Sequence, residues 1–382
     1  MALTVYNIEQ FEKILISKKN RFQLSSSQKK EIFQKIYKKN HIIIGAAGSI
    51  GSVFSKYLLS FKPNKVFLID KDENELTELN RELNVYKNNN CEVNYICCDI
   101  LNLNLKNFSL INNITGIYNF SALKHVRSEE NLISSNYMFK VNSANFLNFN
   151  DPKNVKYIFS VSTDKANKPT SLLGVSKKLM EHTLFEIKKK NKKKNICSVR
   201  FTNVSFSKGS ILKSIYDRCI KGGTFGIPLN VKRYFITHEE SASLCFKSLL
   251  NECRNNIVLP NPDQINHPKD IYELCLKILK KLNVKFKMNK ESLNAKNIKI
   301  RFNKILTYGQ KRIEDLSVNE EKYITLNDKI IIKTKFRRLN NYQKIIKKLK
   351  KNSLADTKKI AKSIYPSFKY ENHKKVKLSK NV

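Results

Sequence analysis

The chain is poor in acidic residues: its 382 residues include 32 Asp and Glu but 72 Lys and Arg, a formal net charge of +40. It also lacks any apolar run close to the ~18 residues that a membrane-spanning helix needs. Residues 1–16 lack the unbroken apolar core of a signal peptide. We therefore expect a cytoplasmic protein with no membrane span. Its 41% of hydrophobic residues can form the core of one large or two fused domains.

Motifs for metal binding and disulfide pairing are missing as well. None of the eight cysteines stands in a C-x-x-C motif, and no two of the six histidines have the spacing of metal ligands. Several cysteines fall inside apolar strand or helix patterns, which is typical of buried, reduced thiols. We predict no metal site.

The strong positive charge raises the question of a nucleic-acid partner. The chain is rich in Lys, Asn and Ile together, as an AT-rich coding sequence would give, and much of the lysine is spread over apparent helix faces. We therefore expect no specific nucleic-acid partner. The positive field would still favour anionic substrates such as nucleotide diphosphates.

Residue patterning divides the chain into four parts. Residues 1–39 form a helical extension of two short amphipathic helices that pack on the fold or on a partner subunit. Residues 40–205 alternate between strand and helix patterns, which predicts an α/β fold with a doubly wound parallel sheet. Residues 206–333 suit a smaller C-terminal α/β cap, interleaved with that fold, for substrate binding. Residues 334–382 read as a solvated or partly disordered basic tail.

The alternating part can be assigned element by element. The expected strands are 41–45, 65–70, 92–98, 116–120, 155–161 and 196–201. The expected helices between them are 49–60, 73–83, 131–148 and 171–189. Further helical patterns stand at 239–251 and 269–281.

The first strand leads into glycines 45, 48 and 51, then a helix and a second strand that ends in Asp70. This order predicts a dinucleotide site. The glycines permit a tight turn close to a pyrophosphate, the helix N-terminus binds its charge, and Asp70 can accept from the adenosine ribose hydroxyls. Asp70 favours NAD, but the adjacent Lys71 leaves NADP open.

Further polar residues follow the other strands. Asp70, Asp99, Ser121 and the segment 162–165 all stand at carboxyl ends, where ligands bind in a parallel sheet. Asp164 and Lys165 offer a proton donor and acceptor in one loop. A lysine works as a base only if its pKa is lowered, and Lys177 is a candidate for the second cation that lowers it.

Five segments carry a family resemblance. They are Gly-Ala-Ala-Gly-Ser-Ile-Gly at 45–51, Ser-Ala-Leu-Lys-His-Val at 121–126, Ser-Thr-Asp-Lys-Ala through Gly-Val-Ser-Lys at 162–177, Arg-Phe-Thr-Asn-Val with Lys-Gly-Ser between 200 and 210, and Lys-Arg-Tyr-Phe-Ile-Thr at 232–237. Across residues 40–325 the chain resembles the extended short-chain dehydrogenase/reductases (Rossmann fold). Within them it resembles the bacterial UDP-N-acetylglucosamine 4,6-dehydratases, in the soluble short form of legionaminic-acid-type pathways.

The resemblance implies roles for individual residues. For cofactor binding these are Gly45, Gly48, Ser49, Ile50, Gly51, Asp70, Asp99, Ile100, Ser121, Ala122 and Lys177. For the substrate UDP-sugar they are Lys124, His125, Asn203 and Arg233, with Arg233 at the diphosphate. For catalysis they are Thr163, Asp164, Lys165 and Lys177. Tightly bound NAD or NADP and a homo-oligomer are also implied.

Three positions depart from the family pattern. The usual Tyr-x-x-x-Lys is Leu173-x-x-x-Lys177, so the base for the C4 hydroxyl is in doubt. The usual Thr before the first glycine is Ile44. The C-terminal Arg-Pro-Gly-Glu-Lys pattern is reduced to Thr307-Tyr308-Gly309-Gln310-Lys311, so the resemblance does not identify nucleotide contacts in this segment.

The implied activity oxidises C4 of UDP-N-acetylglucosamine, eliminates water across C5 and C6, and returns hydride to C6. The product is a UDP-2-acetamido-2,6-dideoxy-hexos-4-ulose for surface polysaccharide or nonulosonate biosynthesis. Two alternatives stay open. One is a UDP-sugar 4-epimerase of the same fold. The other is a degenerate binding or scaffold protein of that fold.

Overall fold

The computed structural model describes residues 7–84, 91–144, 154–265, 267–289, 291–295, 298–303, 311–316, 321–327, 329–350 and 354–369. Its centre is a nine-stranded sheet in the order β16-β17-β11-β6-β5-β4-β1-β2-β3. The strands from β3 to β11 in this order run parallel, and β17 and β16 are added antiparallel. The predicted α/β fold with a doubly wound parallel sheet is confirmed.

The bounds of the central sheet agree closely with the sequence pattern. Its strands are β1 (Asn40–Ile44), β2 (Lys65–Asp70), β3 (Glu92–Cys97), β4 (Ile114–Asn119), β5 (Tyr157–Thr163), β6 (Asn195–Phe201), β11 (Asn256–Pro260), β16 (Ile324–Thr325) and β17 (Ile331–Lys335). Strand β5 runs two residues further than predicted, so that Thr163 is its last residue.

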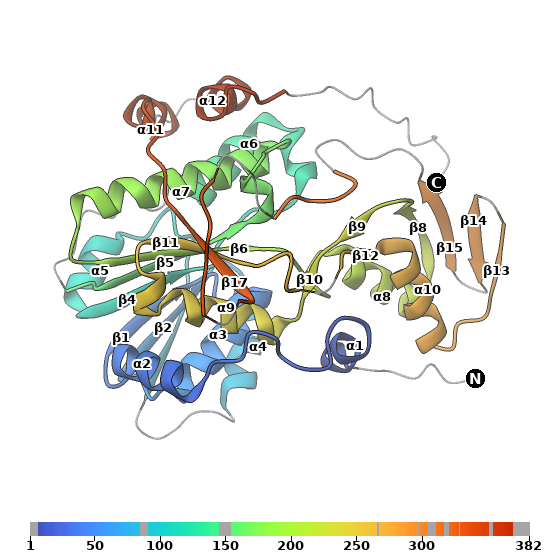
Figure 1. Cartoon of the computed structure of the whole chain (residues 1–382), viewed down its shortest axis with the longest axis horizontal. Coiled ribbons are helices and arrows are strands. Elements are labelled where there is room, and N and C mark those ends of the chain that lie inside the picture. Colours follow the sequence, from blue (N-terminus) through green and yellow to red (C-terminus); the bar gives the residue numbers. More distant parts are fainter. Residues whose placement is uncertain are drawn as a thin grey trace.

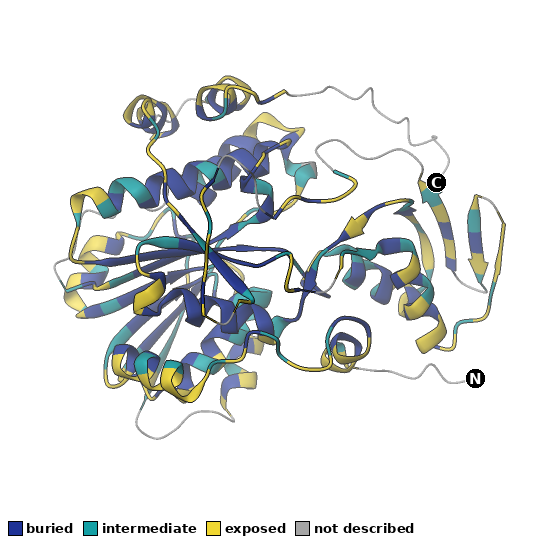
Figure 2. Ribbon diagram, viewed as in Figure 1, coloured by how far each residue is buried: buried dark blue, intermediate teal, exposed yellow. Residues whose placement is uncertain are grey.

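Helices cover both faces of this sheet because its side chains alternate between two apolar cores (Figures 1 and 2). Ile43 packs into one core, and Ile42 and Ile44 pack into the other. The covering helices are α2 (Ser26–Ile36), α3 (Ser49–Ser60), α4 (Glu73–Leu83), α5 (Leu105–Ile111), α6 (Leu132–Phe139), α7 (Leu172–Lys190) and α9 (His238–Ser248). Helix α6 is shorter than predicted because it passes into a π-helical turn, Lys140–Ala144, and residues 145–148 lie outside the described residues.

A smaller lobe lies at one end of the sheet, on the right of Figure 1. Its four-stranded sheet has the order β13-β14-β15-β8. The elements of this region are α8 (Ile211–Lys221), α10 (Ile271–Lys281), β8 (Gly223–Pro228), β13 (Phe286–Met288), β14 (Ser292–Ala295), β15 (Ile298–Asn303), and the short strands β7 (Asn203–Val204), β9 (Lys232–Arg233), β10 (Phe235–Ile236) and β12 (Lys269–Asp270). Helix α1 (Ile8–Leu15) packs into this lobe through Phe11 and Leu15.

The prediction of a solvated tail from residue 334 is wrong as far as residue 369. Helices α11 (Tyr342–Lys350) and α12 (Thr357–Ile364) form a further layer outside α6 and α7 (Figures 1 and 2). Their apolar stripes pack against Phe139 and the outer side of α7. The many lysines of these helices concealed the apolar stripe, because they occupy only its solvent side. Residues 370–382 lie outside the described residues.

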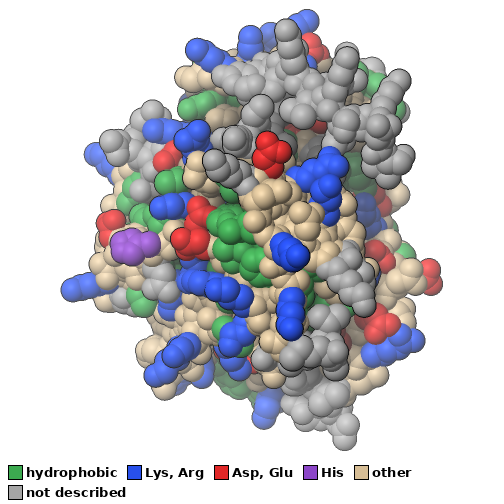
Figure 3. All heavy atoms as spheres, turned by 90° about the vertical axis from the view of Figure 1, so that its right-hand side faces the viewer, with side chains coloured by type: hydrophobic (Ala, Val, Ile, Leu, Met, Phe, Trp, Pro, Cys, Tyr) green, Lys and Arg blue, Asp and Glu red, His purple; other side chains and the backbone are tan. Residues whose placement is uncertain are grey.

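The surface of the smaller lobe carries dispersed charge. Figure 3 shows Lys and Arg side chains scattered over this face among acidic and uncharged ones, without one continuous basic patch. Within the described ranges, no helix has the length and apolar character needed to cross a membrane. Within the same ranges, no cluster of three or more His, Cys, Asp or Glu side chains is arranged to hold a metal ion.

Candidate functional site

The glycine-rich loop between β1 and α3 has no room for a side chain at Gly45 or Gly51. Gly45 has a φ of +72°, and a Cβ on it would lie 2.6 Å from the backbone nitrogen of Ser121. A Cβ on Gly51 would overlap the carbonyl oxygen of Gly45. Gly48 is the N-cap of α3, so Ser49, Ile50 and Gly51 form the first turn of that helix. The loop therefore presents bare backbone beside a helix N-terminus, where a phosphate can bind.

A cavity of about 200 Å³ opens beside this loop at the carboxyl ends of the strands. Its walls include seven of the eleven residues predicted to bind the cofactor: Gly45, Gly48, Asp70, Asp99, Ile100, Ser121 and Ala122. The Asp70 carboxylate accepts from the backbone N–H groups of Ala47 (3.0 Å) and Asp72 (3.2 Å), which fixes it against the loop. This combination of a bare loop, a helix N-terminus and a fixed acid fits the adenosine diphosphate part of a dinucleotide.

Tyr137 of α6 is a cavity residue that the sequence analysis missed. Its hydroxyl donates to Asp99, whose other carboxylate oxygen accepts from the backbone N–H of Leu101 at 2.9 Å. The Lys71 amine lies 5.5 Å from the centre of the Tyr137 ring. No local motif marks Tyr137, because only the fold brings α6 to the end of β3.

The segment 208–210 crosses from the smaller lobe to the glycine-rich loop. The backbone N–H of Lys208 donates to the Ser49 hydroxyl (2.9 Å), and the Lys208 amine donates to the carbonyl of Ala47 (3.0 Å). A Cβ on Gly209 would lie 2.6 Å from Cε1 of His125. Ser49 and His125 therefore contact the smaller lobe, and the side chain of neighbouring Lys124 is exposed.

The predicted acid and base form one contact at the end of β5. The Lys165 amine lies 3.1 Å from Oδ1 of Asp164, and that oxygen also accepts from the Thr163 hydroxyl at 2.9 Å. Asp164 is buried, whereas the Lys165 side chain is 25% exposed. Three consecutive residues therefore place a hydroxyl and an amine within hydrogen-bond distance of the same carboxylate oxygen.

A second carboxylate faces Lys165 from a distant part of the chain. Oε1 of buried Glu314 lies 3.8 Å from the Lys165 amine and 3.9 Å from the Arg233 guanidinium. Burial lowers the pKa of Lys165, but Asp164 and Glu314 outweigh this effect, so its pKa is raised. Our expectation of a lowered pKa with Lys177 as the second cation is therefore wrong. The cation that faces Lys165 is Arg233.

Arg233 lies among backbone carbonyls. Its guanidinium donates to the carbonyls of Lys232 (2.8 Å), Lys311 (2.8 Å) and Arg312 (2.9 Å). Asn203, the other predicted substrate residue of this region, donates its side-chain amide to the carbonyl of Tyr234 at 3.3 Å. Of the degenerate pattern at 307–311, only Lys311 belongs to the described residues.

Lys177 is buried in α7 and donates to the carbonyl of Val161 at 3.0 Å. Burial lowers its pKa to about 8, and Glu181 opposes this effect. Leu173, at the position of the usual tyrosine, is buried, and its backbone N–H donates to Glu129 at 2.9 Å. Lys177 therefore lies one helical turn after Leu173 in α7, with its amine at the carbonyl of Val161 near the end of β5.

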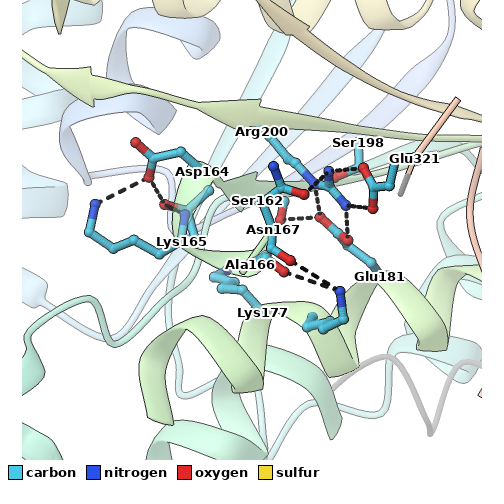
Figure 4. A network of polar contacts seen from close by, with 12 residues as sticks. Ser162, Asp164, Lys165, Ala166, Asn167, Lys177, Glu181, Ser198, Arg200 and Glu321 are labelled. Atoms are coloured by element: carbon cyan, nitrogen blue, oxygen red, sulfur yellow. Dashed lines mark hydrogen bonds and ion pairs between the residues drawn. The ribbon is translucent and has the colours of Figure 1, made fainter. Parts of the chain in front are cut away.

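A buried ion network supports the loop that carries Asp164 and Lys165 (Figure 4). Arg200 of β6 donates two hydrogen bonds of 2.8 Å to Glu181 of α7 and also pairs with Glu321. Arg200 further contacts Asn167 at 3.3 Å, and Ser162 donates to Glu181 at 2.7 Å. The network joins both ends of the segment 162–167 to neighbouring elements, so it fixes the catalytic candidates between them.

The chain is similar to known proteins over most of its length. The model of a family described as "Polysaccharide biosynthesis protein" matches residues 42–335. The chain is 29% identical over 82% of its length to the "Uncharacterized membrane protein MJ1061" of Methanocaldococcus jannaschii, covering 96% of that protein. It is 27% identical over 57% of its length to the capsular polysaccharide biosynthesis protein CapD of Staphylococcus aureus, but covers only 37% of that relative.

Three further similarities concern proteins with more specific names. The chain is 26% identical over 58% of its length to the "UDP-N-acetylglucosamine 4,6-dehydratase (inverting)" of Campylobacter jejuni, covering 66% of that protein. Among solved structures, Pen from Bacillus thuringiensis has a TM-score of 0.66 at 23% identity, covering 79% of this chain and 89% of Pen. The UDP-glucose-4-epimerase of Stenotrophomonas maltophila has a TM-score of 0.58 at 14% identity, covering 72% and 88%. At these identities the structures show a shared fold.

Proposed function

Because this chain belongs to the polysaccharide biosynthesis protein family, we propose that it is an NAD(P)-dependent sugar-nucleotide 4,6-dehydratase. The substrate we propose is UDP-N-acetylglucosamine, and the product is the UDP-4-keto-6-deoxy sugar. The observation that carries this proposal is the Asp164–Lys165 contact of 3.1 Å at the carboxyl edge of the sheet that also forms the dinucleotide cavity. The similarity to a relative named as such a dehydratase supports it.

The cavity residues fit a bound dinucleotide. The backbone of Gly45 and Gly48 and the first turn of α3 would hold the pyrophosphate. Asp70 would accept from the adenosine ribose. Its charge favours NAD, whereas Lys71, which also lines the cavity, leaves NADP open. Asp99, held by Tyr137, would contact the adenine. When bound, the nicotinamide supplies reversible oxidation of C4 and later reduction of C6.

The three residues at the end of β5 can account for the proton transfers. Thr163 would pass the proton of the C4 hydroxyl to Asp164 along their 2.9 Å hydrogen bond. Asp164 would then deliver that proton to the departing C6 hydroxyl, and neutral Lys165 would take the proton from C5, which the C4 ketone acidifies. Lys165 would return a proton to C5 at the end, so that the protons balance over the cycle.

The remaining predicted residues have roles on the substrate side. We propose Lys124, His125 and Asn203 as contacts to the UDP-sugar. Three of the five N–H groups of the Arg233 guanidinium are engaged by backbone carbonyls, and the side chain is only 10% exposed. We therefore propose Arg233 first as the anchor of the segment 311–316.

Product analysis by mass spectrometry would test the proposal. The full chain is incubated with UDP-N-acetylglucosamine and NAD or NADP. Loss of one water from the substrate would support the dehydratase. An epimer of unchanged mass would instead favour the 4-epimerase, since the two activities share the fold and C4 oxidation. A chain that neither binds a dinucleotide nor converts the sugar would leave a scaffold function.

A further inference from the structure

The segment that follows the reduced motif at 307–311 contributes a buried acid, Glu314, to the site. Glu314 follows the eroded pattern at 307–311 and is only 5% exposed. A buried carboxylate is costly unless it has charged or hydrogen-bonding partners. Its partners here are the Lys165 amine at 3.8 Å and the Arg233 guanidinium at 3.9 Å.

We propose that Glu314 is a positioning residue for the Asp164–Lys165 pair, in that it shares the Lys165 ammonium with Asp164 and ties the segment 311–316 to the site through Arg233. This inference rests on the proposed function for its catalytic consequence, but not for the contacts themselves. Nothing in the motif around Asp164 and Lys165 indicates a second acid, because the fold brings Glu314 from nearly 150 residues away.

The segment 311–316 is held at both of its ends, and these contacts keep Glu314 beside Lys165. The Arg233 guanidinium holds the carbonyls of Lys311 and Arg312. At the other end, Leu316 packs into the main core and its carbonyl accepts from the side-chain amide of Asn167 at 3.3 Å. Asn167 lies two residues after Lys165, so the segment and the catalytic loop are joined directly.

The charges around Lys165 explain what Glu314 would do. Lys165 is faced by two carboxylates, Asp164 and Glu314, and by one cation, Arg233. Glu314 is faced by Lys165, Asp164, Arg233 and Lys311. Burial raises the pKa of Glu314, and Lys165, Arg233 and Lys311 oppose this effect. When Glu314 is ionised, its charge acts together with that of Asp164 to retain the proton on Lys165. A base at C5 must lose that proton, so Glu314 sets the pH at which Lys165 becomes competent.

Competitive acetylation with acetic anhydride, read out by peptide mass spectrometry, measures the pKa of the Lys165 amine in the full chain without any sugar nucleotide. In the wild-type protein, we expect Lys165 to titrate above the exposed reference Lys62. In Glu314→Gln, which removes the charge but keeps the shape, we expect its pKa to fall by about one unit or more, since an opposite charge within ~4–6 Å is lost.

Asp315→Asn is the matched control. Asp315 is the next residue, its side chain is 53% exposed, and it pairs with Lys311 at 3.3 Å. This substitution also removes one negative charge, but it should leave the pKa of the Lys165 amine unchanged. An equal pKa for Lys165 in wild type and Glu314→Gln would overturn the proposal, and so would an equal fall in Asp315→Asn. Should Glu314→Gln not fold, a wild-type Lys165 that titrates at or below Lys62 would overturn it as well.

The catalytic consequence has a separate readout. In Glu314→Gln, the rise of kcat/KM with pH should move to lower pH by about one unit, and Glu314→Asp should restore the wild-type profile. A uniform loss of rate at every pH, with no displacement of the profile, would contradict a role in setting the charge of Lys165. If labelling shows the expected shift but no sugar nucleotide is converted, the inference about Glu314 stands and the proposed dehydratase falls.

Discussion

Replacing Glu321 by Gln should destabilise the protein in a pH-dependent way. Hydrogen bonds and charge attraction from Arg200 outweigh burial and lower the pKa of Glu321 from 4.5 to about 2. Its side chain is 4% exposed, so solvent screens this interaction little. A displacement of this size corresponds to about 3 kcal/mol of stability near neutral pH.

The sign of the pH dependence follows from the lowered pKa. The stabilisation by Glu321 is fully present above pH 4.5 and is lost as the pH falls toward 2. Urea unfolding of wild type and Glu321→Gln near pH 7 and near pH 4 should therefore show a smaller difference at the lower pH. Glu92→Gln is the control, because Glu92 pairs with Lys65 at 2.6 Å on the surface, where solvent screens the pair and its contribution to stability is small. A cost below about 1 kcal/mol for Glu321→Gln near pH 7 would refute the reasoning.

Three further predictions concern the site and the C-terminal layer. Asp164→Asn should slow product formation by about 10²–10⁴-fold while the chain still retains its dinucleotide, measured by product assay and by absorbance after denaturation; an unchanged rate would remove Asp164 from the mechanism. Gly51→Ala should lower dinucleotide affinity at least about tenfold in a titration, because the new Cβ would overlap the carbonyl oxygen of Gly45. Gly48→Ala should lower the affinity less, because its Cβ would lie 3.2 Å from the same oxygen. Leu349→Ala should cost about 2–5 kcal/mol in urea unfolding because this side chain is 1% exposed, whereas Leu354→Ala (54% exposed) should change stability by about 0.5 kcal/mol or less; equal effects would place α11 in solvent.

Local patterns predicted the central sheet well because its strands are continuous apolar runs that end in recognisable residues. Asp70 ends β2, and Asp99 and Ser121 follow the ends of β3 and β4 by two residues. All three line the cavity, so its edge could be located from the sequence. The same patterns failed for α11 and α12. There the period-3.6 apolar stripe is real, but dense lysine on the solvent side suggested a tail.

The electrostatic environment of the site could not be predicted in the same way. Glu314 and Glu321 reach Lys165 and Arg200 from a part of the chain with no recognisable pattern, and their roles depend on distances that only the fold sets. The pKa of Lys165 was consequently expected to move in the wrong direction, because the sequence shows Lys177 nearby but not Glu314.

Proton NMR of UDP-N-acetylglucosamine incubated with the full chain and NAD in D₂O tests the central claim most directly. If Asp164 and Lys165 carry out elimination across C5 and C6, the product will be a 4-keto sugar with a new methyl group at C6 and deuterium at C5. Lys165→Met should give no such product while retaining the dinucleotide. A 4-epimer with its C5 proton and C6 hydroxyl intact, or full dehydration by Lys165→Met, would contradict the assignment of these two residues.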